Sequence, residues 1–181
     1  SCDYYAPTIP DLNGIQTSKG DYNSVQLADR MDHPKLIGDI VSSWKKIANN
    51  RKTIVFASSV AHSKNLAESF IDIGIKAAHI DGTTDHAERE RVLKEFNNGD
   101  MKIICNCMVL TEGFDCPPAE VCVLARPTKS LGMYIQMVGR VLRPYEGKEH
   151  ATIIDHSGAV YMHGFVEDDI EWVLDPKKPM T

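Results

Sequence analysis

Short apolar runs alternate with amphipathic segments along most of the sequence, and this alternation restricts the fold more than any other feature. The run TIVFAS at residues 53–58 is continuous and rich in β-branched residues, which is typical of a strand buried on both faces. The segment at 61–74 has helical spacing and ends at Gly74, a common residue at helix C-termini. The same alternation predicts strands at 76–80, 101–106, 121–125 and 151–155 and helices at 33–50, 85–99 and 131–143. This order indicates an α/β fold, here a three-layer α/β/α domain with a mainly parallel sheet.

The sequence divides into three parts. Residues 1–30 contain prolines and glycines without sustained periodicity, so we expect an irregular arm or linker from a preceding domain. Residues 31–157 carry the alternating pattern and are long enough for one core. Residues 158–181 follow as a C-terminal extension. The chain starts at Ser1 rather than at a methionine, which suggests an excised fragment or a processed chain.

Composition restricts the setting in which this chain works. No apolar run approaches the roughly 20 residues of a membrane-spanning helix and no signal pattern is present, so we expect a cytoplasmic protein without a membrane partner. The five cysteines include no CxxC pair, which suits a reducing compartment and argues against a metal site. The formal net charge of −5 argues against a generally basic surface. Residues 121–148 nevertheless hold five cations and one acid, which is compatible with a local basic site.

Ligands of parallel α/β sheets gather at the carboxyl ends of the strands. The loops expected at that edge lie at 58–62, 81–84, 106–117, 126–130 and 156–158. These loops form the candidate functional surface.

Two of these loops begin helices and carry hydroxyl residues. Ser58, Ser59, Thr83 and Thr84 are N-cap candidates, and we expect at least two of them to act as caps. Helix starts also present unpaired N–H groups that bind phosphate. Ser59 and His62 could alternatively form a nucleophile pair, but no G-x-S-x-G elbow surrounds them.

The helix expected at 131–143 contains the segment QMVGRVLRP. At about 100° per residue, Gln136, Arg140 and Arg143 fall on one face. The residues that project to the opposite side are Leu131, Ile135, Val138 and Leu142. Because arginine presents a rigid fork of donors, this face suits phosphate oxygens. Ion pairs with neighbouring carboxylates are the alternative.

The segment TEGFDCPP contains a second candidate constellation. Gly113 permits close backbone approach, and Asp115 offers a carboxylate to sugar hydroxyls, although a plain connecting loop is also compatible. The sequence contains no G-x-x-x-x-G-K-[ST] phosphate loop and no acidic box for Mg²⁺. The chain therefore cannot hold a nucleoside triphosphate by itself.

Four segments follow one another along the chain: TIVFASSVAHSKNLAESF, IDGTT, CNCMVLTEGFDCP and YIQMVGRVLRP. This order resembles that of the second RecA-like domain of superfamily 2 helicases, nearest to the bacterial and phage DEAD/DEAH-type branch that groups with the XPB-like proteins. The resemblance covers about residues 32–157. It implies ATP-dependent helicase or translocase activity on DNA or RNA. It also implies that ATP and Mg²⁺ are bound mainly by an N-terminal RecA-like domain of the same full-length protein.

The resemblance further implies roles for individual residues. Arg140 and Arg143 would be arginine fingers, and Gln136 would orient the γ-phosphate, although many relatives carry His at this place. Asp115 would contact the ribose or the strand-binding loops, and Glu112 and Gly113 would shape that link. The residues that would hold the nucleic-acid backbone are Ser58, Ser59, Gly82, Thr83 and Thr111.

Two other function classes remain open from the residues. A non-catalytic protein-interaction or regulatory module could reuse the same fold, and its arginines would then engage in ion pairs within the domain. A Rossmann-like enzyme for small molecules is disfavoured, since no G-x-G-x-x-G loop follows any strand.

Overall fold

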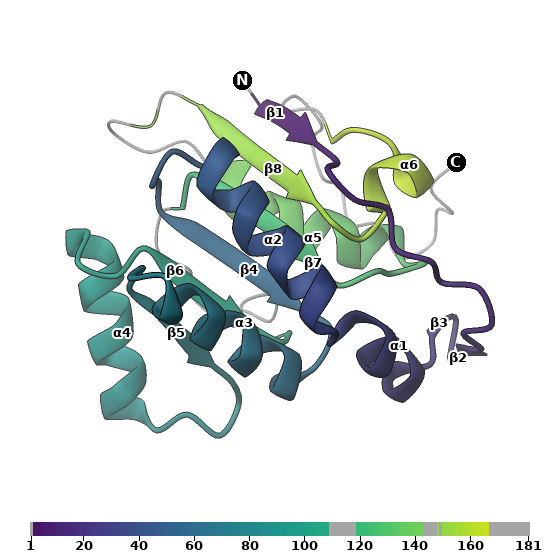
Figure 1. The fold of residues 1–181 in the computed structure, drawn as a ribbon, viewed down its shortest axis with the longest axis horizontal. Coiled ribbons are helices and arrows are strands. Elements are labelled where there is room, and N and C mark those ends of the chain that lie inside the picture. The colour runs from purple at the N-terminus through teal and green to yellow at the C-terminus, as the bar shows by residue number, and fades with distance from the viewer. Residues whose placement is uncertain (1, 109–118, 143–147, 149, 167–181) are drawn as a thin grey trace.

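The computed structural model describes residues 2–108, 119–142, 148 and 150–166 (Figure 1). Its strands are β1 (Cys2–Tyr5), β2 (Thr17–Ser18), β3 (Asp21–Tyr22), β4 (Thr53–Ala57), β5 (Ala77–Ile80), β6 (Ile103–Asn106), β7 (Val121–Ala125) and β8 (Ala151–Asp155). Its helices are α1 (Ser24–Met31), α2 (Pro34–Ile47), α3 (Val60–Asp72), α4 (His86–Asn98), α5 (Leu131–Leu142) and α6 (Ala159–His163). Each strand and helix of the predicted alternation is found, with ends that differ by a few residues.

One parallel sheet forms the centre of the domain. Its strand order is β1-β8-β7-β4-β6-β5, and all neighbouring pairs are parallel. Val55 of β4 lies beside Cys105 of β6 on one side and Val123 of β7 on the other. Strands β4, β6, β7 and β8 are buried along their whole length, which explains why they read as continuous apolar runs. The predicted α/β class and parallel sheet are confirmed.

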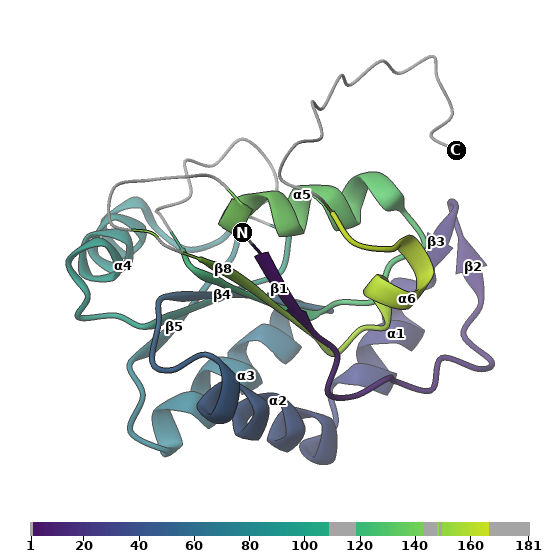
Figure 2. The ribbon, with the colours of Figure 1, turned by 90° about the horizontal axis from the view of Figure 1, so that it is seen from above.

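Helices cover both faces of the sheet, and Figure 2 shows α5 on one side with α2 and α3 on the other. Successive strand residues point to opposite faces, so Phe56 packs in the core of α4 and α5 while Val55 packs in that of α2 and α3. On the second face, the buried indole of Trp44 donates its N–H to Thr53 Oγ1 at 2.7 Å. This bond satisfies the polar group of a large core side chain. The three-layer prediction is confirmed.

The helix starts correct one expectation. Ser59 is the N-cap of α3, but the N-cap of α4 is Asp85, whose carboxylate accepts the Glu88 N–H at 2.8 Å. The prediction that at least two of the four hydroxyl residues act as caps was therefore wrong. The hydroxyls of Thr83 and Thr84 instead form hydrogen bonds to Asp81, the residue that follows β5, within the loop that precedes α4.

Residues 2–30 form strands and a helix rather than an irregular arm. β1 pairs in parallel with β8 as the edge strand of the main sheet, and β2 and β3 form an antiparallel hairpin. α1 buries Leu27 and Met31, which lie one turn apart. The prediction failed because an edge strand with one solvent-facing side needs no apolar run. Its partner is also distant in the sequence, so no local pattern reveals the pairing.

The domain continues past residue 157. Ala159 and Val160 of α6 are buried, and the Val166 N–H donates to the Tyr4 hydroxyl at 2.8 Å. That hydroxyl donates in turn to the Val166 carbonyl at 2.6 Å, which ties residues 158–166 to β1. α6 was not among the predicted helices, because a five-residue helix gives too little periodicity to be recognised. In the part of the chain that the structure describes, no helix is long and apolar enough to cross a membrane.

Candidate functional site

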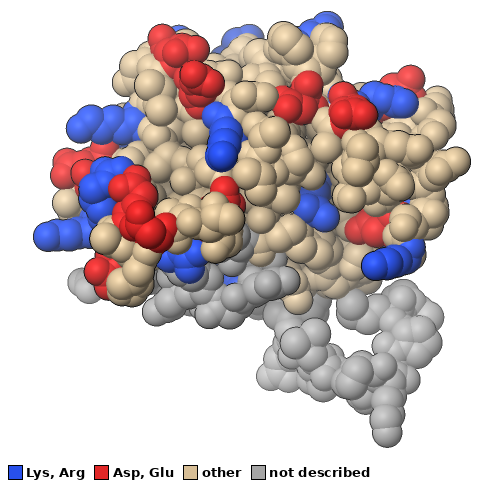
Figure 3. Space-filling model, turned by 90° about the horizontal axis from the view of Figure 1, so that it is seen from below, with Lys and Arg blue, Asp and Glu red and all other residues tan. Residues whose placement is uncertain are grey.

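The carboxyl ends of the parallel strands bring the predicted loops to one edge of the sheet. β4 leads into Ser58 and Ser59, β5 leads into residues 81–85, and β7 leads into residues 126–130. Figure 3 shows the underside of the molecule in Figure 1, the side of edge strand β5, where Lys and Arg are interspersed with Asp and Glu. This side of the molecule therefore presents no general positive field to an anionic partner.

α5 has one buried and one exposed side. Gln136 is exposed and Arg140 is partly exposed, one helical turn further along. The structure thus places both residues where the helical spacing predicts. The fully buried residues are Tyr134, Met137, Val138 and Val141.

The buried side of α5 differs in part from the predicted one. Leu131, Ile135 and Leu142 were expected opposite the polar face, yet they are only partly buried at the rim of the core. The core side instead includes Tyr134, whose hydroxyl donates to the Gly164 carbonyl at 2.8 Å. Residues 164–166 pack against this side of α5. Tyr134 is therefore buried by a segment that has no helical pattern in the sequence.

The two serines after β4 have different surroundings. Ser58 is 4% exposed, and its hydroxyl donates to the Ala125 carbonyl at 2.7 Å, which ties the end of β4 to the end of β7. The half-buried Ser59 accepts the His62 N–H at 3.0 Å as the cap of α3. Of these two residues, only Ser59 lies where its hydroxyl can meet a ligand at the surface.

The His62 side chain does not activate Ser59. Its Nδ1 accepts the backbone N–H of Ser58 at 3.0 Å, and its Nε2 is buried without a hydrogen-bond partner among the described residues. Burial lowers the pKa of His62 to about 4, with Asp32 opposing this effect. A neutral, fully buried imidazole bonded to the backbone removes the nucleophile-pair alternative.

Asp81 organises the loop after β5. Its carboxylate accepts the Thr83 N–H at 2.7 Å and the Thr83 hydroxyl at 2.5 Å, and its own N–H donates to Thr84 Oγ1 at 2.9 Å. The Thr83 hydroxyl and then the His79 imidazole hold the pKa of the Asp81 carboxyl well below its usual range. Gly82 and Thr83 form the exposed tip of this loop. Both Thr83 donors are engaged by Asp81, so the tip offers the Gly82 N–H to a ligand.

No individual role was predicted for His79 or Asp81, although a pattern in the sequence indicates their contact. His79 lies near the end of β5, and its Nε2 is 2.6 Å from Asp81 Oδ2. Residues two apart on a strand point to the same face. A polar pair at positions i and i+2, at the carboxyl end of an otherwise apolar strand, is therefore the pattern that indicates this contact.

Arg126 is another residue at this edge for which no individual role was predicted. It follows β7 directly, and its Nη1 donates to the Sγ of Cys107, which follows β6, at 3.6 Å. Burial raises the pKa of the Cys107 thiol, and the Arg126 guanidinium only partly opposes this effect. Cys107 is therefore a neutral thiol beside a cation at the carboxyl edge.

Several predicted site residues lie outside the described part of the chain. They are Thr111, Glu112, Gly113, Asp115 and Arg143. Their roles remain predictions from the sequence.

A parallel sheet between two helix layers, with a polar face on α5, has the architecture of a RecA-like domain. The profile of the family described as Helicase conserved C-terminal domain matches residues 32–145, which is more than half of the chain. The chain belongs to this helicase C-terminal domain family. The sheet and its helix layers are the family's fold, and α5 carries the last of the motifs identified in the sequence.

Curated relatives and solved structures agree with this assignment. A Lactococcus phage "51.5 kDa protein" is 36% identical over 93% of this chain and 37% of its own length. The Saccharomyces cerevisiae protein named "Putative ATP-dependent helicase IRC3" is 31% identical over 90% of this chain and 25% of its own length. This chain thus spans only about a quarter to a third of these relatives.

Two solved structures share the fold. A fragment titled as "a putative HsdR subunit of a type I restriction enzyme from Vibrio vulnificus YJ016" matches 92% of this chain and 35% of that chain, with a TM-score of 0.68 and 21% identity. The C-terminal domain of the DEAD-box protein Dbp5 matches 66% of this chain and 71% of that chain, with a TM-score of 0.55 and 19% identity. At these identities the likeness establishes the RecA-like fold alone.

Proposed function

We propose that this chain is the C-terminal motor lobe of an ATP-dependent nucleic-acid helicase or translocase. The observation that carries the proposal is the exposed face of α5, on which Gln136 and Arg140 lie one turn apart above a fully buried core side. Arg143, predicted on the same face, would extend it toward a bound polyphosphate. The name of the yeast relative, an ATP-dependent helicase, supports the use of ATP.

The chain would complete an ATP site rather than form one. ATP and Mg²⁺ would be held mainly by a preceding RecA-like lobe of the same full-length protein, since this sequence contains no phosphate loop. ATP hydrolysis needs neutralisation of the charge that develops on the γ-phosphate, and an arginine finger contributes about 10³ to 10⁵ in rate. Arg140 and Arg143 would reach that phosphate only when the lobes close, which makes hydrolysis depend on closure. Gln136 would orient the γ-phosphate side of the site.

The loops at the carboxyl edge would hold DNA or RNA by its phosphate backbone. Ser59 at the start of α3 and the exposed Gly82–Thr83 tip are the accessible candidates among the described residues, with Thr111 predicted nearby in the motif. The buried Ser58 supports this surface through its bond to Ala125 rather than through direct contact. Contacts to phosphates alone make binding tolerant of sequence.

The decisive experiment compares ATP hydrolysis by the full-length protein and by its Arg140→Ala variant, with single-stranded DNA, duplex DNA and RNA. We expect nucleic-acid-stimulated turnover to fall by about a hundredfold or more, because the γ-phosphate charge is no longer neutralised. Binding of a fluorescent ATP analogue should weaken by less than about tenfold, since the preceding lobe holds most of the nucleotide.

Arg91→Ala is the matched control. Arg91 lies on the exposed side of α4 and, in the part of the chain that the structure describes, pairs with Glu88 and Glu95 of the same helix, so its loss should leave turnover unchanged. Wild-type turnover in Arg140→Ala would refute the arginine role. A full-length protein without any nucleic-acid-stimulated ATP hydrolysis would refute the motor function and favour a non-catalytic interaction module.

A further inference from the structure

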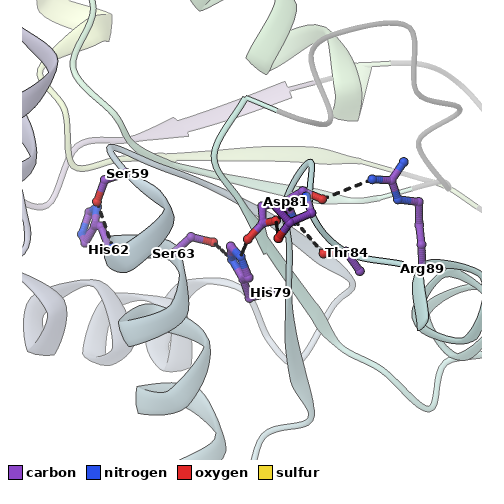
Figure 4. A network of polar contacts seen from close by, with 8 residues as sticks. Ser59, His62, Ser63, His79, Asp81, Thr84 and Arg89 are labelled. Carbon is purple, nitrogen blue, oxygen red and sulfur yellow. Dashed lines mark hydrogen bonds and ion pairs between the residues drawn. The ribbon is translucent and has the colours of Figure 1, made fainter. Parts of the chain in front are cut away.

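A buried set of polar side chains joins α3 to the loop after β5 (Figure 4). Ser63 Oγ lies 2.6 Å from His79 Nδ1, and His79 Nε2 lies 2.6 Å from Asp81 Oδ2. The side chains of His79 and Asp81 are 12% and 8% exposed, and Ser63 is fully buried. We refer to Ser63, His79 and Asp81 as the His79 network.

The direction of each hydrogen bond follows from the charge of Asp81. Its depressed pKa makes this side chain an anion, which accepts hydrogen bonds but donates none. His79 Nε2 therefore carries the hydrogen of the bond to Asp81. In the neutral imidazole, Nδ1 then accepts, and the Ser63 hydroxyl donates to it. Each of the two hydrogen bonds between Ser63, His79 and Asp81 thus joins one donor to one acceptor.

The order Ser, His, Asp is that of a hydrolytic triad, but this network cannot act as one. The Ser63 hydroxyl is inside the domain on the first turn of α3, where no substrate can reach it. The network must therefore act on the elements that it joins.

Those elements carry both proposed nucleic-acid contacts. Through its backbone, Ser63 donates an N–H to the carbonyl of Ser59 at 2.9 Å, so the network begins one turn inside the helix start. At its other end, Asp81 accepts both donors of Thr83 and thereby shapes the Gly82–Thr83 tip. The Arg89 Nη2 also donates to the Asp81 carbonyl at 3.2 Å, which anchors the same loop to α4.

We propose that His79 is a positioning residue that fixes the Gly82–Thr83 tip relative to the Ser59 start of α3, so that the two can hold phosphates of one nucleic-acid strand together. This inference rests on the proposed function. It assigns part of the protein's affinity for nucleic acid to contacts in the interior of the domain. The network also keeps the negative charge of Asp81 engaged with internal donors, and this charge would otherwise face the phosphates.

Loss of the imidazole should therefore weaken nucleic-acid binding in two ways. The tip loses its link to α3, and the Asp81 carboxylate loses one of its three side-chain and backbone donors. A buried anion with an unpaired oxygen rearranges toward solvent, which here means toward the bound strand. Neither change touches the exposed face of α5, so ATP turnover on saturating nucleic acid should persist.

The test uses the full-length protein with four variants. His79→Phe keeps an aromatic ring but removes both ring nitrogens, and His79→Gln retains an amide N–H that can donate to Asp81. Ser63→Ala removes the α3 end of the network. Ser69→Ala is the matched control on the same helix, since its partly exposed hydroxyl donates to the Asn65 carbonyl of α3 and, among the described residues, has no bond to the network.

The test measures three quantities: the nucleic-acid concentration for half-maximal ATP hydrolysis, the maximal turnover, and the dependence of affinity on salt. We expect His79→Phe to raise the nucleic-acid concentration for half-maximal ATP hydrolysis by roughly fivefold or more, with maximal turnover within about twofold of wild type. The dependence of log affinity on log salt should become shallower by about 0.7 to 0.9, as for one lost phosphate contact. Ser63→Ala should shift half-saturation in the same direction, His79→Gln should stay within about twofold of wild type, and Ser69→Ala should match wild type.

Unchanged half-saturation and salt dependence in His79→Phe would overturn the proposal, as would a loss of maximal turnover alone. If His79→Phe does not fold, Ser63→Ala decides, and equality with Ser69→Ala would overturn it. Fluorescence anisotropy of labelled single-stranded DNA provides a readout independent of ATP. A wild-type protein that binds this DNA without stimulated ATP hydrolysis would refute the proposed motor function, while the His79 network would remain testable by binding.

Discussion

Two buried histidines should make the folded chain lose stability in mild acid. Burial lowers the pKa values of His62 and His156 to about 4, from 6.5 for a solvated imidazole. Each Nε2 is buried without a hydrogen-bond partner among the described residues. Their Nδ1 atoms bond to the Ser58 N–H and the Thr8 hydroxyl. A proton added to His62 Nδ1 would face the Ser58 N–H, which is itself a donor, and neither buried Nε2 has an acceptor among the described residues.

These pKa values determine whether acid raises or lowers the unfolding free energy and over which pH interval it does so. Both pKa values are lower in the folded chain, so the unfolded chain binds protons first as the pH falls below about 6.5. The loss of unfolding free energy is complete below about pH 4, at about 3 kcal/mol per imidazole. Between pH 7 and pH 5.5, each imidazole lowers the unfolding free energy by about 1.2 kcal/mol, and the pair lowers it by about 2.5 kcal/mol. The stability that comes from the lowered pKa of Asp81 is lost only below about pH 4, outside this interval.

Urea unfolding of the 181-residue chain, followed by tryptophan fluorescence at several pH values, measures this loss. His156→Gln removes one titrating group and should roughly halve the decrease between pH 7 and pH 5.5, whatever its effect on absolute stability. His86→Gln is the control, because the His86 side chain is 84% exposed and pairs with Glu90, which is also exposed and lies on the same helix. A wild-type free energy that changes by less than about 0.5 kcal/mol over this interval would refute the reasoning.

Two further predictions concern local contacts. Asp85→Ala removes the N-cap of α4 and should lower the unfolding free energy by about 1 kcal/mol in the same urea assay, whereas an unchanged midpoint would show that the Glu88 N–H finds another acceptor. Asp21→Ala removes the acceptor of the Thr128 hydroxyl and the Lys129 N–H, so amide hydrogen exchange at residues 17–22 should accelerate while the central strands keep their protection. Equal exchange in both chains at residues 17–22 would mean that the hairpin is held by other contacts.

The sequence predicts the elements whose cause is local. Strands such as β4 are continuous apolar runs, and α3 shows helical spacing up to Gly74, so both are visible in any short window. β1 and α6 are not visible in this way. β1 is held by pairing with β8 at the opposite end of the chain, and α6 is a single short turn fixed by packing. Their stability comes from tertiary contacts that no local pattern encodes.

The candidate site also contains residues whose placement follows from local spacing and residues whose roles depend on distant segments. The polar face of α5 follows from the spacing of Gln136 and Arg140 within one helix, so the sequence was sufficient to place it. The roles of Ser58 and Thr83 depend on partners in other segments, namely the Ala125 carbonyl and the Asp81 carboxylate. Residue type alone does not distinguish a hydroxyl that meets a ligand from one that bonds inward.

The position of β1 has a practical consequence for any shortened version of this protein. The family profile begins at residue 32, and a chain cut there would lack the strand that covers β8. The N–H and C=O groups along that side of β8 would then be open to solvent beside a hydrophobic sheet, which is a template for pairing between molecules. Such a truncation is expected to aggregate even though every recognisable motif is retained, so the first 31 residues should be kept wherever the domain is expressed alone.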